Sequence, residues 1–369
     1  MTRTLRRLAD ENLLIVQVWL VSRLLFAIIA VTLAVVGRRD LGSVLAQWDV
    51  GHFLKIAREG YADPAEMAFF PGLPLILRGF TELGLPAVLA GTVLALACSL
   101  LAAFALKRIA GTWGAIAWVL APTAVFTAVP YTEAPFCAAA FWAWERATQR
   151  RWGQAALLAA LACTLRVSGL FLVGALVILA LTQGNERRRR GVRAVTVGER
   201  LAWLILPTAV LAAYVVYLYG LTGSWTAWFA AQEAGWDRGF HWPWEALRNH
   251  WDVVWRPTPD HPEWVWLFRA ELVSWVVGVV VTLVALFRRR VAEAAWVGVQ
   301  VLAFSLSYWL MSVNRAVLLW FPLWRQVGEF VESRPATTGW KVVGVLVGLV
   351  ALAVQGVWAW LYFTGRWSS

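Results

Sequence analysis

Long apolar runs, each wide enough to cross a lipid bilayer, limit most strongly what this chain can fold into. A helix needs about 20 mostly apolar residues to cross the hydrocarbon core of a membrane. The chain has 369 residues, of which 60% are hydrophobic and 15% charged, whereas a soluble domain is about a quarter charged. The sequence therefore predicts an all-α, polytopic transmembrane bundle. It excludes soluble enzymes, DNA-binding domains and disordered proteins.

The apolar runs predict about eleven transmembrane spans within a single membrane domain, residues 1–369. In chain order the predicted spans are 13–36, 85–106, 111–129, 132–146, 152–165, 168–182, 201–222, 270–287, 292–311, 316–331 and 342–362. Prolines and a glycine interrupt the region from 109 to 182, and breaks at membrane depth need protein or water to satisfy the backbone. The first run is too long for a cleavable signal peptide, so we expect it to be retained as a helix.

Basic residues fall in alternate turns, which predicts the orientation of the spans. With the N-terminus in the cytoplasm, the inner turns contain Lys107, Arg108, Arg146, Arg150, Arg151, Arg187–Arg190, Arg193, Arg200, Arg288–Arg290, Arg325, Arg334 and Lys341. Cytoplasmic loops of membrane proteins are enriched in Lys and Arg, so this pattern accounts for the net charge of +11 without a nucleic-acid partner. Arg187–Arg190 form either a solvated loop or a contact with anionic lipid.

Two long segments, 37–84 and 223–268, lie on the predicted outer side. Counting 69–83 as a span would reverse every later loop, so we expect 71–83 to be an amphipathic helix at the outer interface. Segment 223–268 is rich in tryptophan, which suits either sugar rings or lipid headgroups. Its tryptophans are Trp225, Trp228, Trp236, Trp242, Trp244, Trp251, Trp255, Trp264 and Trp266. The irregular spacing of His241, His250 and His261 argues against a metal site.

The first outer segment carries the sharpest candidate for catalysis. Asp49 and His52 are three residues apart, so a helix would place both on one face at the lipid boundary. A carboxylate beside apolar Trp48 and near an imidazole can be tuned to remove a proton from a hydroxyl. The alternative is an interfacial helix anchored by Trp48, His52 and Lys55, as is common at membrane surfaces.

Other polar residues occur at turns on the same predicted outer side. Tyr131 and Glu133 join two spans, Arg166 joins the next pair, and Arg315 follows the ninth span. Guanidinium groups suit phosphate oxygens, which favours a phosphate-binding role for either arginine. The alternative is that they pair with Glu133 and Asp49 and hold the bundle together, or snorkel to the interface.

The chain contains neither a P-loop nor a dinucleotide fingerprint. Because nucleotide sugars are cytoplasmic, an enzyme with an outward-facing site would need a donor that is carried across the membrane on a lipid. This argument comes from the compartment and not from any residue.

Several short blocks lie along the chain: Trp48-Asp49-Val50-Gly51-His52-Phe53, Ala68-Phe69-Phe70-Pro71, Pro122-Thr123-Ala124 with Tyr131-Thr132-Glu133, Arg166 with Gly169-Leu170, and Arg315 with Phe321-Pro322. Together these blocks resemble the PIG-V-type mannosyltransferases. They occur in the family's order over residues 48–322, and the first block is the most specific. One position departs from the pattern, since Ala316 follows Arg315 where the resemblance leads us to expect tyrosine.

The resemblance implies a GT-C fold and an inverting glycosyltransferase that uses polyprenyl-phosphate-mannose. Carried over to this chain, it implies that Asp49 is the general base that deprotonates the acceptor hydroxyl. From residue chemistry we expect the donor and acceptor to be oriented by Trp48, His52, Glu66, Phe70, Tyr131 and Glu133, and the phosphate by Arg166 or Arg315. Asp49 and Glu66 could also share a divalent cation, although no spacing requires one and no metal site is predicted.

The expected acceptor is a glycolipid or a protein, and membrane lipid is the surrounding partner. High Ala, Val, Arg and Trp content suggests a bacterium, with the enzyme in the plasma membrane (bacterial inner membrane), the N-terminus cytoplasmic and the active site on the outer face. Three alternatives remain at this point: another polyprenyl-phosphate sugar, a lipid-linked-sugar flippase or transporter, and a noncatalytic partner subunit.

Overall fold

The structure is a computed structural model that describes residues 3–183, 195–256, 263–335 and 337–368. Throughout these ranges the regular elements are helices, which confirms the all-α prediction. Five helices are long and apolar enough to cross a membrane: Ala9–Val36, Ala87–Val119, Val197–Thr222, Trp264–Phe287 and Thr338–Phe363. The chain is therefore a multi-pass membrane protein. The Arg187–Arg190 run and His261 lie outside the described residues.

The chain divides into two compact units. Unit 1 comprises Met1–Ala57, Ile76–Ala138 and Asn314–Ser369, and unit 2 comprises Arg58–Leu75 and Ala139–Val313. Each unit is thus assembled from segments that are far apart in the sequence. The expectation of one catalytic domain stays a prediction.

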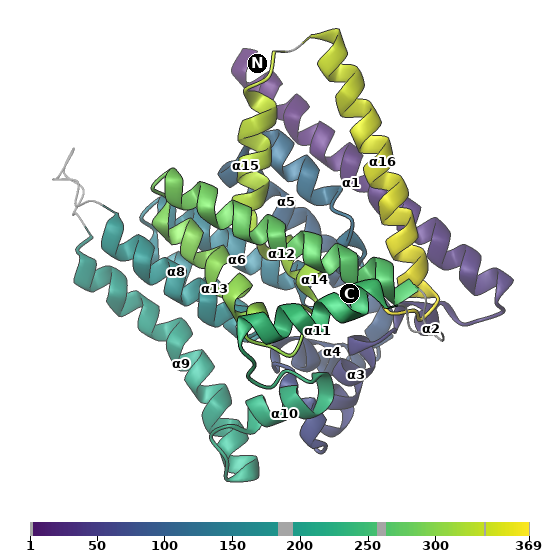
Figure 1. The fold of residues 1–369 in the computed structure, drawn as a ribbon, viewed down its shortest axis with the longest axis vertical. Helices are drawn as coiled ribbons and strands as arrows, with labels where there is room; N and C mark the ends of the chain where they lie inside the picture. Colours follow the sequence, from purple (N-terminus) through teal and green to yellow (C-terminus); the bar gives the residue numbers. More distant parts are fainter. Residues whose placement is uncertain (1–2, 184–194, 257–262, 336, 369) are drawn as a thin grey trace. The chain divides into compact units, whose positions relative to one another are not determined.

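Unit 1 is built around long apolar helices. Helix α1 (Arg3–Val36) packs against α5 (Ala87–Val119) and α16 (Thr338–Phe363), and α5 packs against α15 (Phe321–Glu332). The purple α1 and the yellow α16 run side by side although they come from opposite ends of the chain (Figure 1). The shorter elements wholly or mainly in this unit are α2 (Leu41–Leu45), α3 (Asp49–Glu59), α4 (Gly72–Glu82), η2 (Ala124–Thr127) and η3 (Val317–Leu319).

Small residues allow α5 and α15 to approach closely. A Cβ at Gly114 would lie 2.6 Å from the Trp324 carbonyl oxygen, and one at Gly328 would meet the backbone around Ala110. Membrane helices commonly pack through small residues, because the lipid supplies little hydrophobic drive for their association. Gly111, with φ of 76°, breaks α5 in the left-handed conformation that glycine adopts without penalty.

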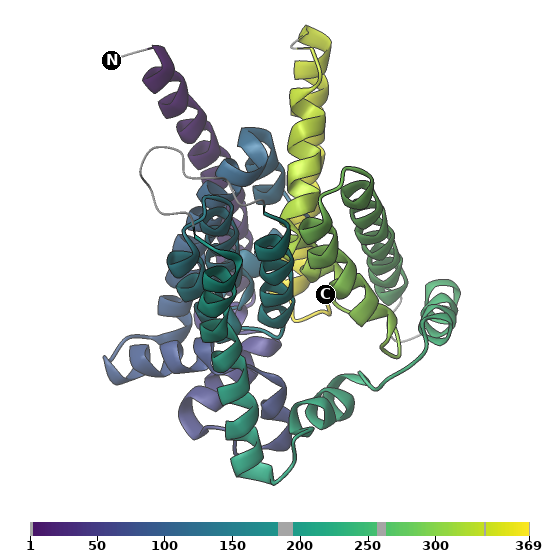
Figure 2. The same ribbon diagram turned by 90° about the vertical axis from the view of Figure 1, so that its left-hand side faces the viewer.

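Unit 2 contains a second set of helices. These are α7 (Trp152–Cys163), α8 (Ser168–Thr182), α9 (Val197–Thr222), α10 (Ala227–Trp236), α11 (Pro243–Trp255), α12 (Glu263–Phe287) and α13 (Val291–Ser305), with η1 (Pro64–Ala68) joining from the first outer segment. Helices α7, α8 and α9 pack on one another, and α13 packs on both α8 and α12. The green α12 and α13 run side by side in both views (Figure 1, Figure 2). Among the described elements, four helices cross the division between units: α3, α4, α6 (Glu133–Thr148) and α14 (Val313–Ala316).

Local sequence signals set several helix ends. Thr196 and Glu199 form a reciprocal capping box at the start of α9, with Glu199 N–H donating to Thr196 Oγ1 at 3.2 Å. The same helix ends at Gly223, whose φ of 70° supplies a left-handed cap.

Some predicted spans have different limits in the structure. The helix expected over 111–129 stops at Val119 and is followed by turns and η2, so its second half was wrong. The expected span 316–331 is divided into η3 and α15, while α13 ends at Ser305 instead of 311. Apolarity alone suggested continuous helices here, but buried side chains satisfy the backbone where the chain turns. The predicted amphipathic segment 71–83 is helical as α4.

Candidate active site

Two carboxylates of unit 1 share one arginine. Arg315 donates from Nη1 to Asp49 Oδ2 at 3.0 Å and from Nε to Glu133 Oε1 at 2.9 Å. The Glu133 side chain is fully buried, whereas those of Arg315 and Asp49 remain 13% and 18% exposed. The arginine reaches Asp49 through Oδ2, one of the two carboxylate oxygens. Asp49 is therefore partly accessible, and the buried pair of Arg315 and Glu133 holds it in place.

An aromatic enclosure surrounds Arg315. Its guanidinium carbon lies 5.1 Å from the ring centre of Phe126 and 5.0 Å from that of Tyr131, distances typical of cation–π contacts. Burial alone would lower the pKa of Arg315, but the Glu133 and Asp49 carboxylates together raise it above its usual value. The arginine consequently stays charged and keeps both ion pairs.

Two tyrosines hold the turn that delivers Asp49. Trp48 has φ of 54°, a left-handed conformation that is costly for a non-glycine residue. The Asp49 N–H donates to Tyr131 Oη at 3.1 Å, while Tyr362 Oη donates to the Leu45 carbonyl at 3.0 Å and lies 3.4 Å from the Gln47 carbonyl. Burial raises the pKa of the Tyr131 hydroxyl well above its usual value, so it remains protonated. The turn is therefore fixed on both sides of Trp48.

A buried arginine inside α1 fixes the loop that follows α5. Arg23 donates from Nη1 to the Ala124 carbonyl at 3.1 Å and from Nη2 to Thr127 Oγ1 at 2.9 Å. Both acceptors belong to η2, which also carries Phe126 of the aromatic enclosure. An ionisable residue within a membrane span is costly and usually functional. Here it anchors the backbone beneath the candidate site.

Gln355 of α16 satisfies the end of α5 in a similar way. Its amide nitrogen donates to the carbonyls of Val119 at 2.8 Å and Ala121 at 2.9 Å, and its oxygen accepts from Ser22 Oγ at 2.9 Å. All of these contacts are buried. Helices α1 and α16 thus supply the polar groups that a chain break within an apolar bundle requires.

Unit 2 contains the other half of the first outer segment. Tyr61 and Tyr214 both donate to the Phe69 carbonyl, at 2.8 Å and 2.7 Å, and Tyr214 Oη also lies 2.9 Å from the Met67 carbonyl. Burial raises the pKa of Tyr61 above its usual value. Neutral hydroxyl groups therefore hold the backbone of this segment.

The predicted residues Glu66 and Phe70 lie in this held segment. Glu66 is 1% exposed, and the ring of Phe70 is 4.6 Å from that of Tyr214. Helix α10 adds two donors to the Ala68 carbonyl, Trp228 Nε1 at 3.2 Å and Gln232 Nε2 at 3.3 Å. The segment packs as a small aromatic core of unit 2.

The remaining predicted residues are placed as follows. His52 lies three residues after Asp49 on α3, half-buried, so the expected helical spacing is confirmed. Arg166 lies in unit 2 between α7 and α8 and is also half-buried. The structure thus joins Asp49, Tyr131, Glu133 and Arg315 in one cluster, while Glu66, Phe70 and Arg166 belong to unit 2. The divalent cation stays a prediction.

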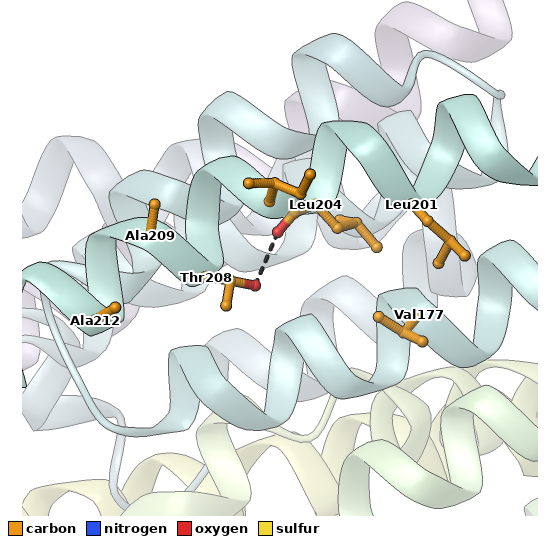
Figure 3. Close-up of a pocket in the computed structure, with 7 residues that line it drawn as sticks. Val177, Leu201, Leu204, Thr208, Ala209 and Ala212 are labelled. Atoms are coloured by element: carbon orange, nitrogen blue, oxygen red, sulfur yellow. Dashed lines mark hydrogen bonds between the residues drawn. The ribbon is translucent and has the colours of Figure 1, made fainter.

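A separate groove of about 310 Å³ lies along α8 and α9 (Figure 3). It is lined by Val177, Leu201, Leu204, Ile205, Thr208, Ala209 and Ala212. The Thr208 hydroxyl already donates to the Leu204 carbonyl at 2.9 Å. The groove offers an apolar surface and includes none of the predicted site residues.

Sequence reasoning missed Arg23, Gln355 and Tyr362. For Arg23 the signal was present, because a lone arginine within a span of apolar residues is unusual. A glutamine or tyrosine in a membrane helix is a weaker signal, since either can lie at an interface. The carbonyls that these two side chains bind become apparent only in the folded chain.

Comparison with known proteins gives a consistent assignment. The family profile described as "Mannosyltransferase (PIG-V)" matches residues 20–219. Human GPI alpha-1,6-mannosyltransferase 2 is 32% identical over 208 residues, covering 49% of this chain and 42% of that protein. The rat protein of the same name is 34% identical over 151 residues, covering 35% of this chain and 30% of its own length.

These alignments span less than half the length of the curated relatives. No solved structure matches the chain. The family match covers more than half of the chain and includes Asp49, Tyr131, Glu133 and Arg166. The chain therefore belongs to the PIG-V mannosyltransferase family.

Proposed function

We propose that this protein transfers mannose from polyprenyl-phosphate-mannose to a hydroxyl of a glycolipid acceptor, with inversion at the anomeric carbon. Membership of the family supports the sugar and the reaction class. A lipid-linked donor is supported by the absence of a nucleotide-binding motif and by the membrane helices. The alternation of basic turns supports an active site on the outer face of a bacterial plasma membrane.

Asp49 is the group that carries this proposal. Its Oδ2 is held by Arg315, and an ionised carboxylate can accept a proton on its other oxygen. In the proposed step the acceptor oxygen forms a bond to the anomeric carbon as its proton passes to Asp49. The bond from that carbon to the phosphate oxygen breaks, and polyprenyl phosphate leaves with the electron pair. General-base assistance of this kind contributes about 10²–10⁴-fold to a rate.

The geometry favours one of the two roles expected for Arg315. Two carboxylates already occupy its Nε and Nη1 groups. We therefore propose that it orients Asp49 rather than receiving the leaving phosphate. Arg166 stays the predicted phosphate ligand, which is consistent with the affinity of guanidinium groups for phosphate oxygens.

A transfer assay with labelled donor tests the proposal. Membranes that contain the wild type or Asp49→Asn receive radiolabelled polyprenyl-phosphate-mannose, and label is followed in lipid and protein fractions. We expect label in the lipid fraction with the wild type and a loss of at least about 100-fold with Asp49→Asn. Unchanged transfer by Asp49→Asn would remove Asp49 as the base.

Asp40→Asn is the matched control. Asp40 lies in the same segment and caps α2 by accepting from Ser43 N–H at 3.0 Å. Asparagine caps helices about as well as aspartate, so this variant should retain activity. Label in the protein fraction would mean that the acceptor is a protein and not a glycolipid. Transfer from a different polyprenyl-phosphate sugar would mean that the proposed donor is wrong.

A further inference from the structure

Helix α11 presents three different faces. Ala246, His250 and Val254 are buried and recur every fourth residue. A second face carries three exposed tryptophans, Trp244, Trp251 and Trp255. With 3.6 residues per turn, these three indoles fall within a narrow arc beside the buried face. The third face is polar and holds Glu245, Asn249 and Asp252, and Arg256 follows as the C-cap residue.

The tryptophan side chains project outward over the full length of the helix. Trp244, Trp251 and Trp255 are 63%, 55% and 57% exposed. Trp266 at the start of α12 is 69% exposed, and Arg269 lies between Trp255 and Trp266, 5.0 Å and 4.7 Å from the two ring centres. We call these four tryptophans the tryptophan stripe.

The buried face of α11 is attached to a membrane span. His250 Nε2 and the Phe268 carbonyl are 2.9 Å apart, and α11 packs along α12. Phe268 is four residues beyond Trp264, where the candidate span begins, which is about 6 Å along a helix axis. Helix α11 is therefore fixed to the end of a span, at the level where that span leaves the hydrocarbon.

We infer that α11 is an interfacial helix whose tryptophan stripe is immersed in the headgroup boundary of a phospholipid membrane. Tryptophan is enriched at this depth because its ring is apolar and its N–H is polar. The polar face of α11 then meets water, and its buried face is already covered by α12. An exposed cation at Arg248 adjoins the stripe, and Arg269 lies within it, which favours anionic phosphate groups.

A sugar platform fits this surface less well. Sugar hydroxyls need placed hydrogen-bonding partners, and carboxylates are absent from the described residues of the stripe. The nearby acids are on the polar face and are engaged: Glu245 accepts from the Trp242 N–H at 3.0 Å, and Asp252 lies 3.9 Å from Arg256. Charge and exposure thus favour a lipid surface over a carbohydrate.

Spin labels at two adjacent positions test the inference. Trp251→Cys and Asp252→Cys are labelled in the full chain with Cys98, Cys137 and Cys163 replaced by alanine, and reconstituted in phosphatidylglycerol vesicles. We expect the label at 251 to relax more with oxygen than with an aqueous nickel chelate, and the label at 252 to show the reverse order. Equal exposure of both labels to the nickel chelate would overturn the inference.

Native fluorescence provides a second test in a chain that keeps its cysteines. Brominated phospholipids should quench less of the total emission when Trp244, Trp251 and Trp255 are replaced by phenylalanine. Trp320→Phe, at a fully buried position, is the control and should not reduce quenching. Unaltered quenching in the triple variant would refute membrane immersion. If methyl α-mannoside protected the tryptophan stripe from quenching, the stripe would be a sugar-binding surface instead.

Discussion

The two halves of the first outer segment are held in place by different chemistry. In unit 1 the half that contains Asp49 is fixed through charged side chains, with Arg315 between two carboxylates. In unit 2 the half that contains Phe69 is fixed through its main chain, by neutral tyrosine hydroxyls. The first arrangement positions a reactive group, and the second sets the shape of a backbone. Substitutions that remove charge should therefore affect the two halves unequally.

Arg315→Met should have the largest effect. It leaves the buried Glu133 and the neighbouring Asp49 without their common cation, and breaking a buried ion pair costs about 3–5 kcal/mol. Thermal unfolding in detergent and mannose transfer should both show the loss. The double variant Arg315→Met with Glu133→Gln should recover part of the stability but not the activity.

The control for this prediction is Arg78→Met. Arg78 and Glu82 are 2.8 Å apart, but both side chains are more than half exposed, and such pairs contribute only about 0–1 kcal/mol. Equal losses for Arg315→Met and Arg78→Met would contradict the view that buried charge holds the unit 1 half.

Acid should destabilise α11 in unit 2, because His250 is buried there as a neutral side chain and protonation would place a charge in that buried position. Burial lowers the pKa of His250 from 6.5 to about 4. The unfolded chain therefore binds a proton before the folded chain does, so stability is complete above about pH 6.5 and falls as the pH drops towards 4. The loss of stability is at most about 3 kcal/mol. Hydrogen exchange of the α11 amides at pH 7 and pH 4.5 measures this loss.

His250→Gln provides the comparison, because glutamine retains an N–H donor for the Phe268 carbonyl and does not titrate. Its α11 amides should exchange with much less change between the two pH values. An equal acid response in the wild type and in this variant would show that another group is responsible.

Thr127→Val tests how far the unit 1 half of the segment depends on the hydrogen bond between Arg23 and Thr127. The substitution removes the hydroxyl that accepts from Arg23, and a hydrogen bond to a charged group contributes about 1.5–3 kcal/mol. We expect kcat to fall more than KM rises, because Phe126 and Tyr131 then support Arg315 less firmly. Thr92→Val is the control, since the Thr92 hydroxyl donates only to the Val88 carbonyl of its own helix.

Tyr214→Phe tests the unit 2 half of the segment and should have the smallest effect on stability. It removes the hydroxyl shared by the Met67 and Phe69 carbonyls, at a cost of about 1–2 kcal/mol, while Tyr61 still donates to Phe69. Tyr219→Phe on the same helix, where the ring stacks on Trp225, should change little. The unfolding midpoints of the two variants measure the difference.

Sequence patterns predicted much of this architecture, for reasons that are local. Apolar runs located the long helices, and unusual polar residues at turns singled out Asp49, Glu133 and Arg315. The predicted helix limits were wrong around 120–132. There Arg23 and Gln355 donate to the backbone carbonyls of a turn, which apolarity alone could not distinguish from a helix. Arg315 was expected to bind either phosphate or the acids, and only its distances to both carboxylates favour the second role.

The pairing of Glu133 with Arg315 also has a consequence for biogenesis. The two residues are 182 positions apart, and ribosomes add about 5–20 residues per second. Glu133 is therefore synthesised about 10–40 s before its cation exists. During that interval the nascent bundle must keep Glu133 at the water boundary, hold it protonated, or shield it with an insertion factor. Chains truncated before residue 315 should be degraded as orphaned intermediates.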